Sequence, residues 1–199
     1  MIRYVVLDLG QVLASPSDLF RAPADLLGVD ADALAGLYWT DRRDYDTGGP
    51  SVNYWGPILD ALGVSVTEPL VAQLAGLDAD LWTELRPSAL ELVRTVHSWG
   101  VPLAILSNAP HEMGPAVRAS AWVALFERVF ISAEMGLTKP DPAIYAEVTA
   151  ALGVAPGEIA FIDDRAPNSD AAAAFGWQSH LWIDDTDSLT WLRGVCVRA

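Results

Sequence analysis

The sequence has little cysteine and lacks any long run of apolar residues. Its single cysteine, Cys196, excludes an internal disulfide and is typical of a protein kept in the reducing cytosol. The first apolar run ends after four residues at Asp8, so it does not have the pattern of a signal peptide. No uncharged apolar run approaches the roughly 20 residues that a membrane span needs. We therefore expect a soluble, cytoplasmic protein.

Basic residues are scarce as well. Lysine and arginine together number 12 against 26 aspartates and glutamates, which leaves a formal net charge of −14. A surface of this charge repels the phosphate backbone of nucleic acids and the anionic face of membranes. We therefore expect neither nucleic acid nor membrane as a partner.

Apolar residues, in contrast, are plentiful. Of the 199 residues 52% are hydrophobic and eight are tryptophan, enough for one medium domain or for one domain with an insert. Five short apolar runs have the pattern of buried parallel strands, and they centre on Val5, Ile105, Phe130, Phe161 and Leu181. All but the first two are separated by segments long enough for one helix. This alternation predicts a doubly wound α/β fold, a parallel sheet with helices on both faces.

The interval between the first two strands is the exception. About 80 residues separate Leu9 from Pro87, far more than one crossover helix needs. The interval has the pattern of several helices, broken by the sequence Gly48-Gly49-Pro50. We predict an inserted helical cap over residues 16–85, with residues 1–15 and 86–199 forming the α/β core domain.

Polar residues follow four of the predicted strands, at the sheet edge where parallel α/β proteins bind their ligands. These residues are Asp8 after the first strand, Ser107-Asn108 after the second, Lys139 after the third and Asp163-Asp164 after the fourth. Each of these residues alone is common in turns, loops or helix caps. Together, the carboxylates suit a hard divalent cation, while the hydroxyl and the ammonium group suit a phosphate. Asp8 could then attack the phosphorus atom as a nucleophile.

These positions lie in four motifs, LDLGQVL, ILSN, GLTKPDPAIY and FIDDRAPNSDAAAAFGW. In this order the motifs resemble those of the haloacid dehalogenase-like (HAD) hydrolases. The resemblance covers nearly the whole chain, with the inserted helices in the place of the family's cap. Among subgroups the sequence is most similar to sugar-phosphate phosphatases and to the phosphatase domain of soluble epoxide hydrolases. Those relatives share the Ser-Asn ending, the Lys-Pro step and the Asp-Asp pair followed by an asparagine, here Asn168.

The resemblance implies a Rossmann-like core and a hydrolase that forms an aspartyl-phosphate on Asp8, with Lys139 as a second catalytic residue. It implies that the phosphate is bound by Ser107, Asn108, Lys139 and Gly10. It also implies that Mg²⁺ is bound by Asp8, the Gly10 carbonyl and Asp164, with Asp163 supporting the metal from beside it.

The resemblance also bears on the cap, because in capped relatives the loop near Gly48 and Gly49 reaches the active site. Residues expected to select the substrate are Arg42, Arg43, Thr47, Gly48 and Ser51. The two arginines could clamp a second anionic group, or they could form a solvated helix end. The aromatic cluster of this region is expected to fill the cap interior, with one or two members facing the substrate: Tyr38, Trp39, Tyr45, Tyr54 and Trp55.

Gly10 departs from the family pattern, since most phosphatases of the family carry there a second aspartate that serves as general acid and base. Three interpretations stay open. The first is a phosphatase with acid help from elsewhere, and the second is a metal-free 2-haloacid dehalogenase, whose halide leaves without a proton. The third is a catalytically silent member that binds a phosphorylated ligand or a protein. The pair Asp163-Asp164 favours the first, because a metal-free dehalogenase has no evident use for it.

We therefore predict a magnesium-dependent phosphatase of a small phosphorylated metabolite, whose identity and the protein's oligomeric state stay open. Without an acid at Gly10, substrates with good leaving groups, such as sugar 1-phosphates, should be preferred. If no such preference exists, another residue supplies the proton, and His111 and Asp46 are the first candidates.

Overall fold

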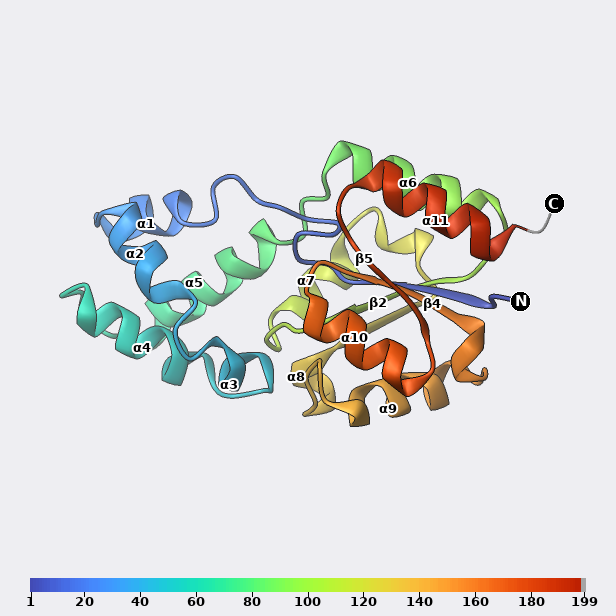
Figure 1. Ribbon diagram of the computed structural model, residues 1–199. Coiled ribbons are helices and arrows are strands. Elements are labelled where there is room, and N and C mark those ends of the chain that lie inside the picture. The colour runs from blue at the N-terminus through green and yellow to red at the C-terminus, as the bar shows by residue number, and fades with distance from the viewer. Residues whose placement is uncertain (198–199) are drawn as a thin grey trace.

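Five parallel strands form the central sheet of the computed structural model, which describes residues 1–197 (Figure 1). The strands are β1 (Tyr4–Leu7), β2 (Leu103–Ser107), β3 (Arg128–Ile131), β4 (Ile159–Asp163) and β5 (Gln178–Leu181). Their spatial order is β3-β2-β1-β4-β5, so the chain starts in the middle of the sheet and winds outward to each edge in turn. The doubly wound sheet predicted from the five apolar runs is confirmed.

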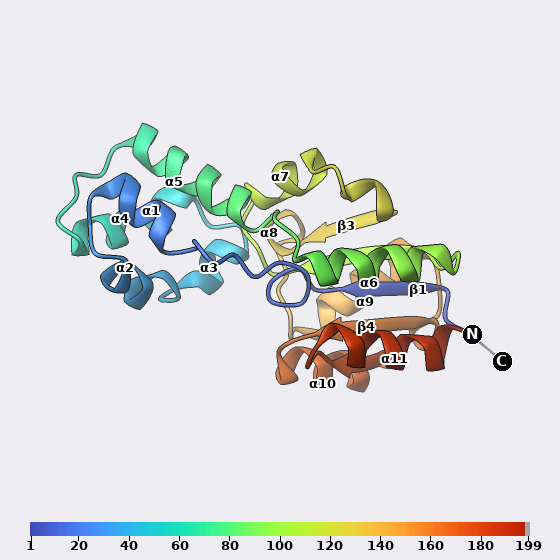
Figure 2. The same cartoon turned by 90° about the horizontal axis from the view of Figure 1, so that it is seen from above.

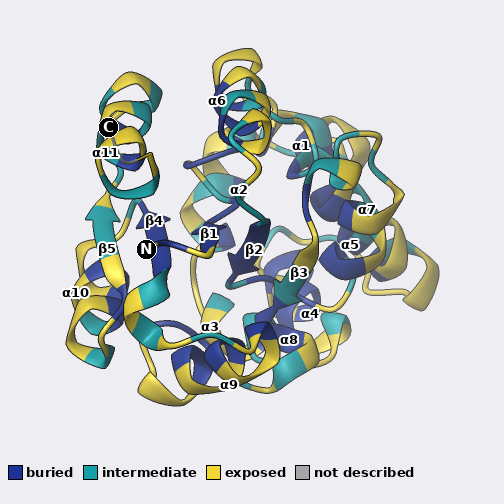
Figure 3. Ribbon diagram, turned by 90° about the vertical axis from the view of Figure 1, so that its right-hand side faces the viewer, coloured by how far each residue is buried: buried dark blue, intermediate teal, exposed yellow. Residues whose placement is uncertain are grey.

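The three central strands are buried over their whole length, whereas β3 and β5 at the edges are partly exposed (Figure 3). Successive residues of β1 point to opposite faces. Val5 and Leu7 belong to the apolar cluster on one face of the sheet, and Tyr4 and Val6 belong to the cluster on the other. Burial on both faces explains why the central strands are continuous apolar runs in the sequence.

Helices cover both faces of the sheet (Figures 1 and 2). On one face lie α6 (Pro87–Ser98) and α11 (Asp185–Cys196), and on the other lie α9 (Pro142–Leu152) and α10 (Ala166–Phe175). The shorter elements are α7 (Met113–Ala119), α8 (Ser132–Met135), η1 (Val123–Leu125) and η2 (Pro156–Glu158). Among residues 1–197, none of the helices combines the length and the apolar character required to cross a membrane.

The chain between β1 and α6 forms a separate group of helices beyond the carboxyl ends of the strands (Figures 1 and 2). They are α1 (Arg21–Leu27), α2 (Ala31–Tyr38), α3 (Arg42–Asp46), α4 (Ser51–Ala61) and α5 (Glu68–Leu81), and we call them the helical cap. Tyr38, Trp55 and Leu74 are fully buried within it, so the cap has an apolar interior of its own. The predicted insertion of helices is thus present, and the boundaries of independent domains stay a prediction.

Two chain segments connect the cap to the core, and they pair with each other. Ala14 and Leu85 form an antiparallel bridge. Next to it, the guanidinium group of Arg86 donates hydrogen bonds to the Val12 carbonyl at 2.7 Å and to the carboxylate of Asp185 at 2.7 and 2.8 Å. Because Asp185 begins α11, these contacts join the cap entrance to the core.

Candidate active site

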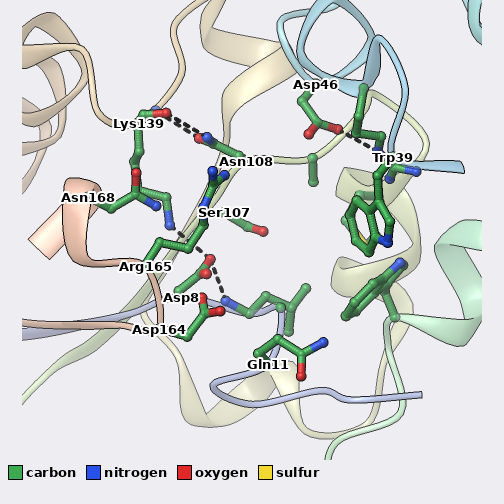
Figure 4. A pocket seen from close by; sticks show the side chains of 16 residues that line it. Asp8, Gln11, Trp39, Asp46, Ser107, Asn108, Lys139, Asp164, Arg165 and Asn168 are labelled. Atoms are coloured by element: carbon green, nitrogen blue, oxygen red, sulfur yellow. Dashed lines mark hydrogen bonds and ion pairs between the residues drawn. The ribbon is translucent and has the colours of Figure 1, made fainter. Parts of the chain in front are cut away.

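The carboxyl ends of the central strands open into a cavity of about 150 Å³ that is lined by the core and the helical cap (Figure 4). Residues predicted from the sequence form its core wall: Asp8, Gly10, Ser107, Asn108, Lys139 and Asp164. Asp163 ends β4 directly beneath them and is fully buried. The fold therefore brings all the predicted strand-end residues together.

Lys139 lies at the centre of this group. Its Nζ atom is 2.9 Å from Asp8 Oδ1 and 2.6 Å from Asp163 Oδ2, and it donates to the Leu106 carbonyl at 2.8 Å. An ammonium group has three hydrogens, so these contacts use every donor that Lys139 has. Lys139 therefore holds two carboxylates in place. It acts on a bound anion through its charge, because a direct hydrogen bond to the anion would require Asp8 to move away.

Asp163 is surrounded by donors. Its Oδ1 accepts from the Arg165 amide at 2.9 Å, and both oxygens lie near the side-chain amide of Asn168, at 3.0 and 3.1 Å. With Lys139 on Oδ2, both oxygens are engaged inside the protein. This geometry fits a residue that supports a metal site from behind better than it fits a direct ligand.

Negative charge is in excess at this end of the cavity. Asp8, Asp163 and Asp164 place ligand oxygens within 4.8 Å of one another, and Lys139 balances one of the three charges. Burial raises the pKa of Asp8 to about 7; Lys139 opposes this rise, whereas Asp163 and Asp164 add to it. Burial and the neighbouring Asp163 also raise the pKa of Asp164. The group is therefore arranged to take up positive charge.

Ser107 and Asn108 are neighbours with different surroundings. Ser107 is buried at the cavity wall, and within residues 1–197 its hydroxyl group makes no hydrogen bond to the protein. The side-chain amide of Asn108 accepts from the Lys139 amide and donates to the Lys139 carbonyl, both at 2.8 Å. Asn108 thus ties the Lys139 loop to the end of β2. It also lines the cavity, and its contact with a phosphate stays a prediction.

The cap wall of the cavity consists of Trp39, Arg42, Asp46 and Trp82. Of the five cap residues expected to select the substrate, four do not line the cavity: Arg43, Thr47, Gly48 and Ser51. The Thr47 hydroxyl donates to the Arg43 carbonyl at 2.7 Å. Gly48 packs against the core, and a Cβ atom at this position would lie 3.0 Å from the Ala133 carbonyl oxygen. The structure therefore does not support direct substrate contacts for these four.

Arg42 is enclosed by two carboxylates and three aromatic rings. Its Nε atom is 3.0 Å from Asp46 Oδ1, and its Nη2 atom is 3.1 Å from Asp78 Oδ2. The guanidinium carbon lies 4.8, 5.3 and 5.2 Å from the ring centres of Tyr38, Tyr45 and Tyr54. The hydroxyl of Tyr38 donates to Asp78 in turn. Arg42 reaches the cavity, as expected, but its charge is already paired.

A model of the haloacid dehalogenase-like hydrolase family matches residues 38–176, more than half of the chain. The chain belongs to this family. The predicted family and hydrolase class are thereby confirmed, and the sheet described above is the family's α/β fold.

Known HAD-like hydrolases similar to this one differ in activity. The (S)-2-haloacid dehalogenase 4A of Burkholderia cepacia is 26% identical and covers 89% of this chain and 81% of its own. Phosphoserine phosphatase of Thermus thermophilus is 31% identical over 50% of this chain and 41% of its own. A HAD family enzyme from Bacteroides thetaiotaomicron, solved with magnesium and inorganic phosphate, superimposes with a TM-score of 0.72 at 21% identity, over 91% of this chain and 94% of its own. At 21% identity, this superposition shows a shared fold alone.

In this HAD-like hydrolase the backbone at Gly10 does not require glycine. Gly10 is not among the glycines with positive φ, although the next residue, Gln11, has φ of 59°. A Cβ atom at position 10 would lie 3.7 Å from the ring of Trp82, an ordinary contact. The Gly10 carbonyl accepts from the Val12 amide at 2.6 Å. The backbone conformation at position 10 would therefore allow an aspartate, and there is room for its side chain.

Several lining residues were not predicted from the sequence, among them Gln11, Trp82 and Arg165. Arg165 directly follows Asp163-Asp164, so its place beside a strand-end motif was a usable signal. Trp82 had none, because its position depends on how α5 packs over Gly10. His111 is exposed and packs beside Gly48 rather than lining the cavity.

Proposed function

We propose that this hydrolase is a magnesium-dependent phosphatase that acts on a small phosphorylated metabolite through an aspartyl-phosphate on Asp8. The observation that carries the proposal is the excess of carboxylates over ammonium groups at the core end of the cavity. A metal-free halide displacement by Asp8 gains nothing from this excess. Without a cation, the added negative charge works against the ionised form that the nucleophile needs.

The donor set fits Mg²⁺. Asp8, Gly10 and Asp164 line the cavity together, and carboxylate, carbonyl and water oxygens are the ligands that this ion prefers. We assign the ion to Asp8, Asp164 and the Gly10 carbonyl, with Asp163 behind them. Bound there, Mg²⁺ would balance the excess negative charge and part of the charge of a phosphate.

The chain's own residues then have distinct tasks. The hydroxyl of Ser107 is available to donate to a phosphate oxygen, and the charge of Lys139 attracts the anion. An oxygen of Asp8 forms a bond to phosphorus while the bond from phosphorus to the leaving oxygen breaks. Water next attacks the phosphorus, which frees inorganic phosphate and restores the carboxylate.

The remaining walls favour a small substrate with an apolar side. Trp39, Trp82 and Met113 line a cavity of about 150 Å³ together with the charged groups. Pockets that combine aromatic walls with a few polar groups suit small molecules held in one orientation. A sugar phosphate, whose ring has an apolar face, is the substrate class that we favour.

A 2-haloacid dehalogenase is the second candidate, favoured by relatives such as the Burkholderia cepacia enzyme and by Arg165. Arg165 lines the cavity, and within residues 1–197 it forms no ion pair with a carboxylate. Its planar guanidinium group could bind a substrate carboxylate through two hydrogen bonds. In that reaction Asp8 would displace the halide from carbon, and no metal would be needed.

One experiment separates the candidates. Hydrolysis of sugar phosphates, nucleotides, acyl phosphates and 4-nitrophenyl phosphate is measured with magnesium and with EDTA, and chloride release from 2-chloropropionate is followed in parallel. We expect phosphate hydrolysis that EDTA abolishes and added magnesium restores. Chloride release that persists in EDTA would establish the dehalogenase instead. Absence of both reactions would indicate a member that only binds its ligand.

A further inference from the structure

We propose that Asp46, from the helical cap, is the general acid and base of this enzyme and takes the part that Gly10 cannot perform. The inference rests on the phosphatase activity proposed above and adds a catalytic residue to it. Three observations carry it: the position of Asp46 in the cavity, the anchoring of its backbone to the core, and the charge of the groups around it.

Asp46 is the last residue of α3 and lines the same cavity as Asp8. Figure 4 places it across the cavity from Asp8, on the cap side. In a cavity of about 150 Å³, a phosphate bonded to Asp8 leaves its leaving group directed toward the cap wall. The carboxyl group of Asp46 is therefore placed where the leaving oxygen emerges.

The core fixes this position. Ser132, the first residue of α8, donates its hydroxyl hydrogen to the Asp46 carbonyl at 2.5 Å. The same oxygen of Ser132 accepts from the Ala109 amide at 2.8 Å, in the loop that directly follows Ser107 at the end of β2. One serine thus joins the cap residue to the end of the strand that carries Ser107, which is expected to bind the phosphate. A catalytic acid on a cap needs such a link, because a misplacement of 1 Å costs rate.

The charges around Asp46 favour a proton on it. Arg42 is shared between Asp46 and Asp78, so the three groups carry one excess negative charge when all are ionised. Burial raises the pKa of Asp46 to about 6; Arg42 opposes the rise, Asp78 adds to it, and Arg165 opposes it weakly. Tyr54 faces the same guanidinium group at 3.4 Å. General acids work best with a pKa near the working pH, and a carboxyl group with an ordinary pKa would carry almost no proton there.

The other titratable groups that line the cavity are less suited. Asp8 and Asp164 are assigned to the nucleophile and the ion, Lys139 has no free donor, and an arginine does not release a proton at any physiological pH. His111, the other candidate from the sequence, does not line the cavity. Asp46 remains, with one carboxyl group that no other step uses.

The proposed steps balance. Asp46 in its acid form gives its proton to the leaving oxygen as the bond from phosphorus to that oxygen breaks and the bond from Asp8 to phosphorus forms. The alcohol departs, and Asp46 is left as a carboxylate. It then takes a proton from the water that attacks the aspartyl-phosphate, which yields inorganic phosphate and restores both aspartates to their initial forms.

Asp46→Asn tests the proposal, with 4-nitrobenzyl phosphate and 4-nitrophenyl phosphate as substrates in the presence of magnesium. The two substrates have similar shapes, but the benzyl alkoxide needs a proton to leave and the nitrophenolate does not. We expect kcat/KM for the benzyl ester to fall by about 10²- to 10⁴-fold, the usual contribution of a positioned acid. Activity on the phenyl ester should change by less than about tenfold, because its leaving group needs no acid. Asp44→Asn, an exposed acid on the same helix, is the matched control and should alter neither.

A rescue variant separates chemistry from structure. Gly10→Asp, which the backbone and the space beside Trp82 permit, should restore benzyl ester hydrolysis in the Asp46→Asn background. In the wild type, the ratio of benzyl to phenyl kcat/KM should fall as the pH rises through the pKa of Asp46, whereas titration of Asp8 cancels from the ratio. Equal losses on both esters together with a flat ratio would overturn the role of Asp46 and leave the phosphatase intact. If the wild type hydrolyses neither ester with magnesium, the proposed function fails and this inference with it.

Discussion

Two buried clusters face each other across the cavity, and each holds one cation between two carboxylates. The core cluster is Lys139 with Asp8 and Asp163, and the cap cluster is Arg42 with Asp46 and Asp78. In each, one carboxylate is closed off and the other lines the cavity. The side chains of Asp163 and Asp78 are 0% and 1% exposed, against 10% for Asp8 and 14% for Asp46.

The clusters differ in the positive charge that each still needs. Asp164 adds a third carboxylate to the core cluster, which leaves two negative charges in excess when all groups are ionised. The cap cluster has an excess of one. A divalent cation balances the first and a single proton balances the second. The same arrangement thus suits a metal-assisted nucleophile on one side of the cavity and, on our proposal, a proton donor on the other.

The largest effect is expected from the cavity-facing carboxylate of the core cluster. Asp8→Asn removes the nucleophile, and turnover should fall by on the order of 10⁴-fold or more, since such losses are typical when a nucleophile is deleted. The fold should persist, because Lys139 keeps Asp163 and the excess negative charge becomes smaller. The measurements are phosphate release and the thermal unfolding midpoint. A folded variant with wild-type activity would rule out an aspartyl-phosphate.

The enclosed carboxylate of the core cluster should matter most for stability. Asp163→Ala leaves Lys139 with Asp8 alone and takes the acceptor from the Asn168 amide and the Arg165 backbone. Removing one partner of a buried ion pair costs about 3–5 kcal/mol. Urea unfolding should show a loss of this size.

Asp78→Ala is the matched change in the cap. Its cost should be smaller, because Arg42 keeps Asp46 and the faces of three tyrosine rings. Equal losses in the free energy of unfolding for Asp163→Ala and Asp78→Ala would mean that the two clusters contribute equally to stability.

A milder change to Asp78 tests how the cap cluster sets the proton on Asp46. The negative charge of Asp78 raises the pKa of Asp46, so Asp78→Asn should lower that pKa. A general acid works only while protonated. The fall in the benzyl-to-phenyl ratio of kcat/KM should therefore begin at lower pH in the variant, and a shift of one unit means about tenfold less acid form above the pKa. An unchanged pH profile would show that Asp46 and Asp78 are not coupled through Arg42.

The core cluster was predictable from the sequence and the cap cluster was not, for a physical reason. Parallel strands place their carboxyl ends at one edge, so Asp8, Ser107 and Asp163-Asp164 are brought together by pattern alone. No comparable rule determines which residues of neighbouring cap helices come together. The pairing of Arg42 with Asp78 depends on how α3 packs against α5, and no spacing in the sequence indicates it.

For the same reason, residues chosen by closeness to Gly48 in the sequence did not reach the cavity. Thr47 turns back to its own helix, and Gly48 packs on Ala133. Trp39 fits the expectation that one or two members of the aromatic cluster face the cavity, yet the sequence could not say which. Asn108 lines the cavity as expected, but its strand-end position did not indicate that both ends of its side-chain amide bind the backbone of Lys139.

The smallest effect is expected from an ion pair outside both clusters, Arg86 with Asp185, which lies away from the cavity where the cap joins the core. Burial would raise the pKa of Asp185, but hydrogen bonds from Arg86 and Trp182 outweigh it and hold that pKa below its usual value. A carboxyl group with a lowered pKa in the folded state stabilises the protein above its unfolded pKa, near 4, and loses this contribution as the pH falls through the folded value.

Asp185→Asn should therefore lower the free energy of unfolding by about 1 kcal/mol at pH 7, the upper end for partly exposed pairs. The difference from the wild type should begin to shrink below about pH 4, where Asp185 of the unfolded chain takes up a proton, and should vanish once the pH lies below the lowered pKa of the folded state. Urea unfolding at both pH values measures it, with the exposed acid Glu84, beside the same junction, changed to Gln as control. Because the pair is remote from the cavity, kcat/KM should stay at the wild-type level. A loss of activity with unchanged stability would mean that Arg86 sets the position of the cap over Asp8, and that the two clusters depend on this junction to face each other.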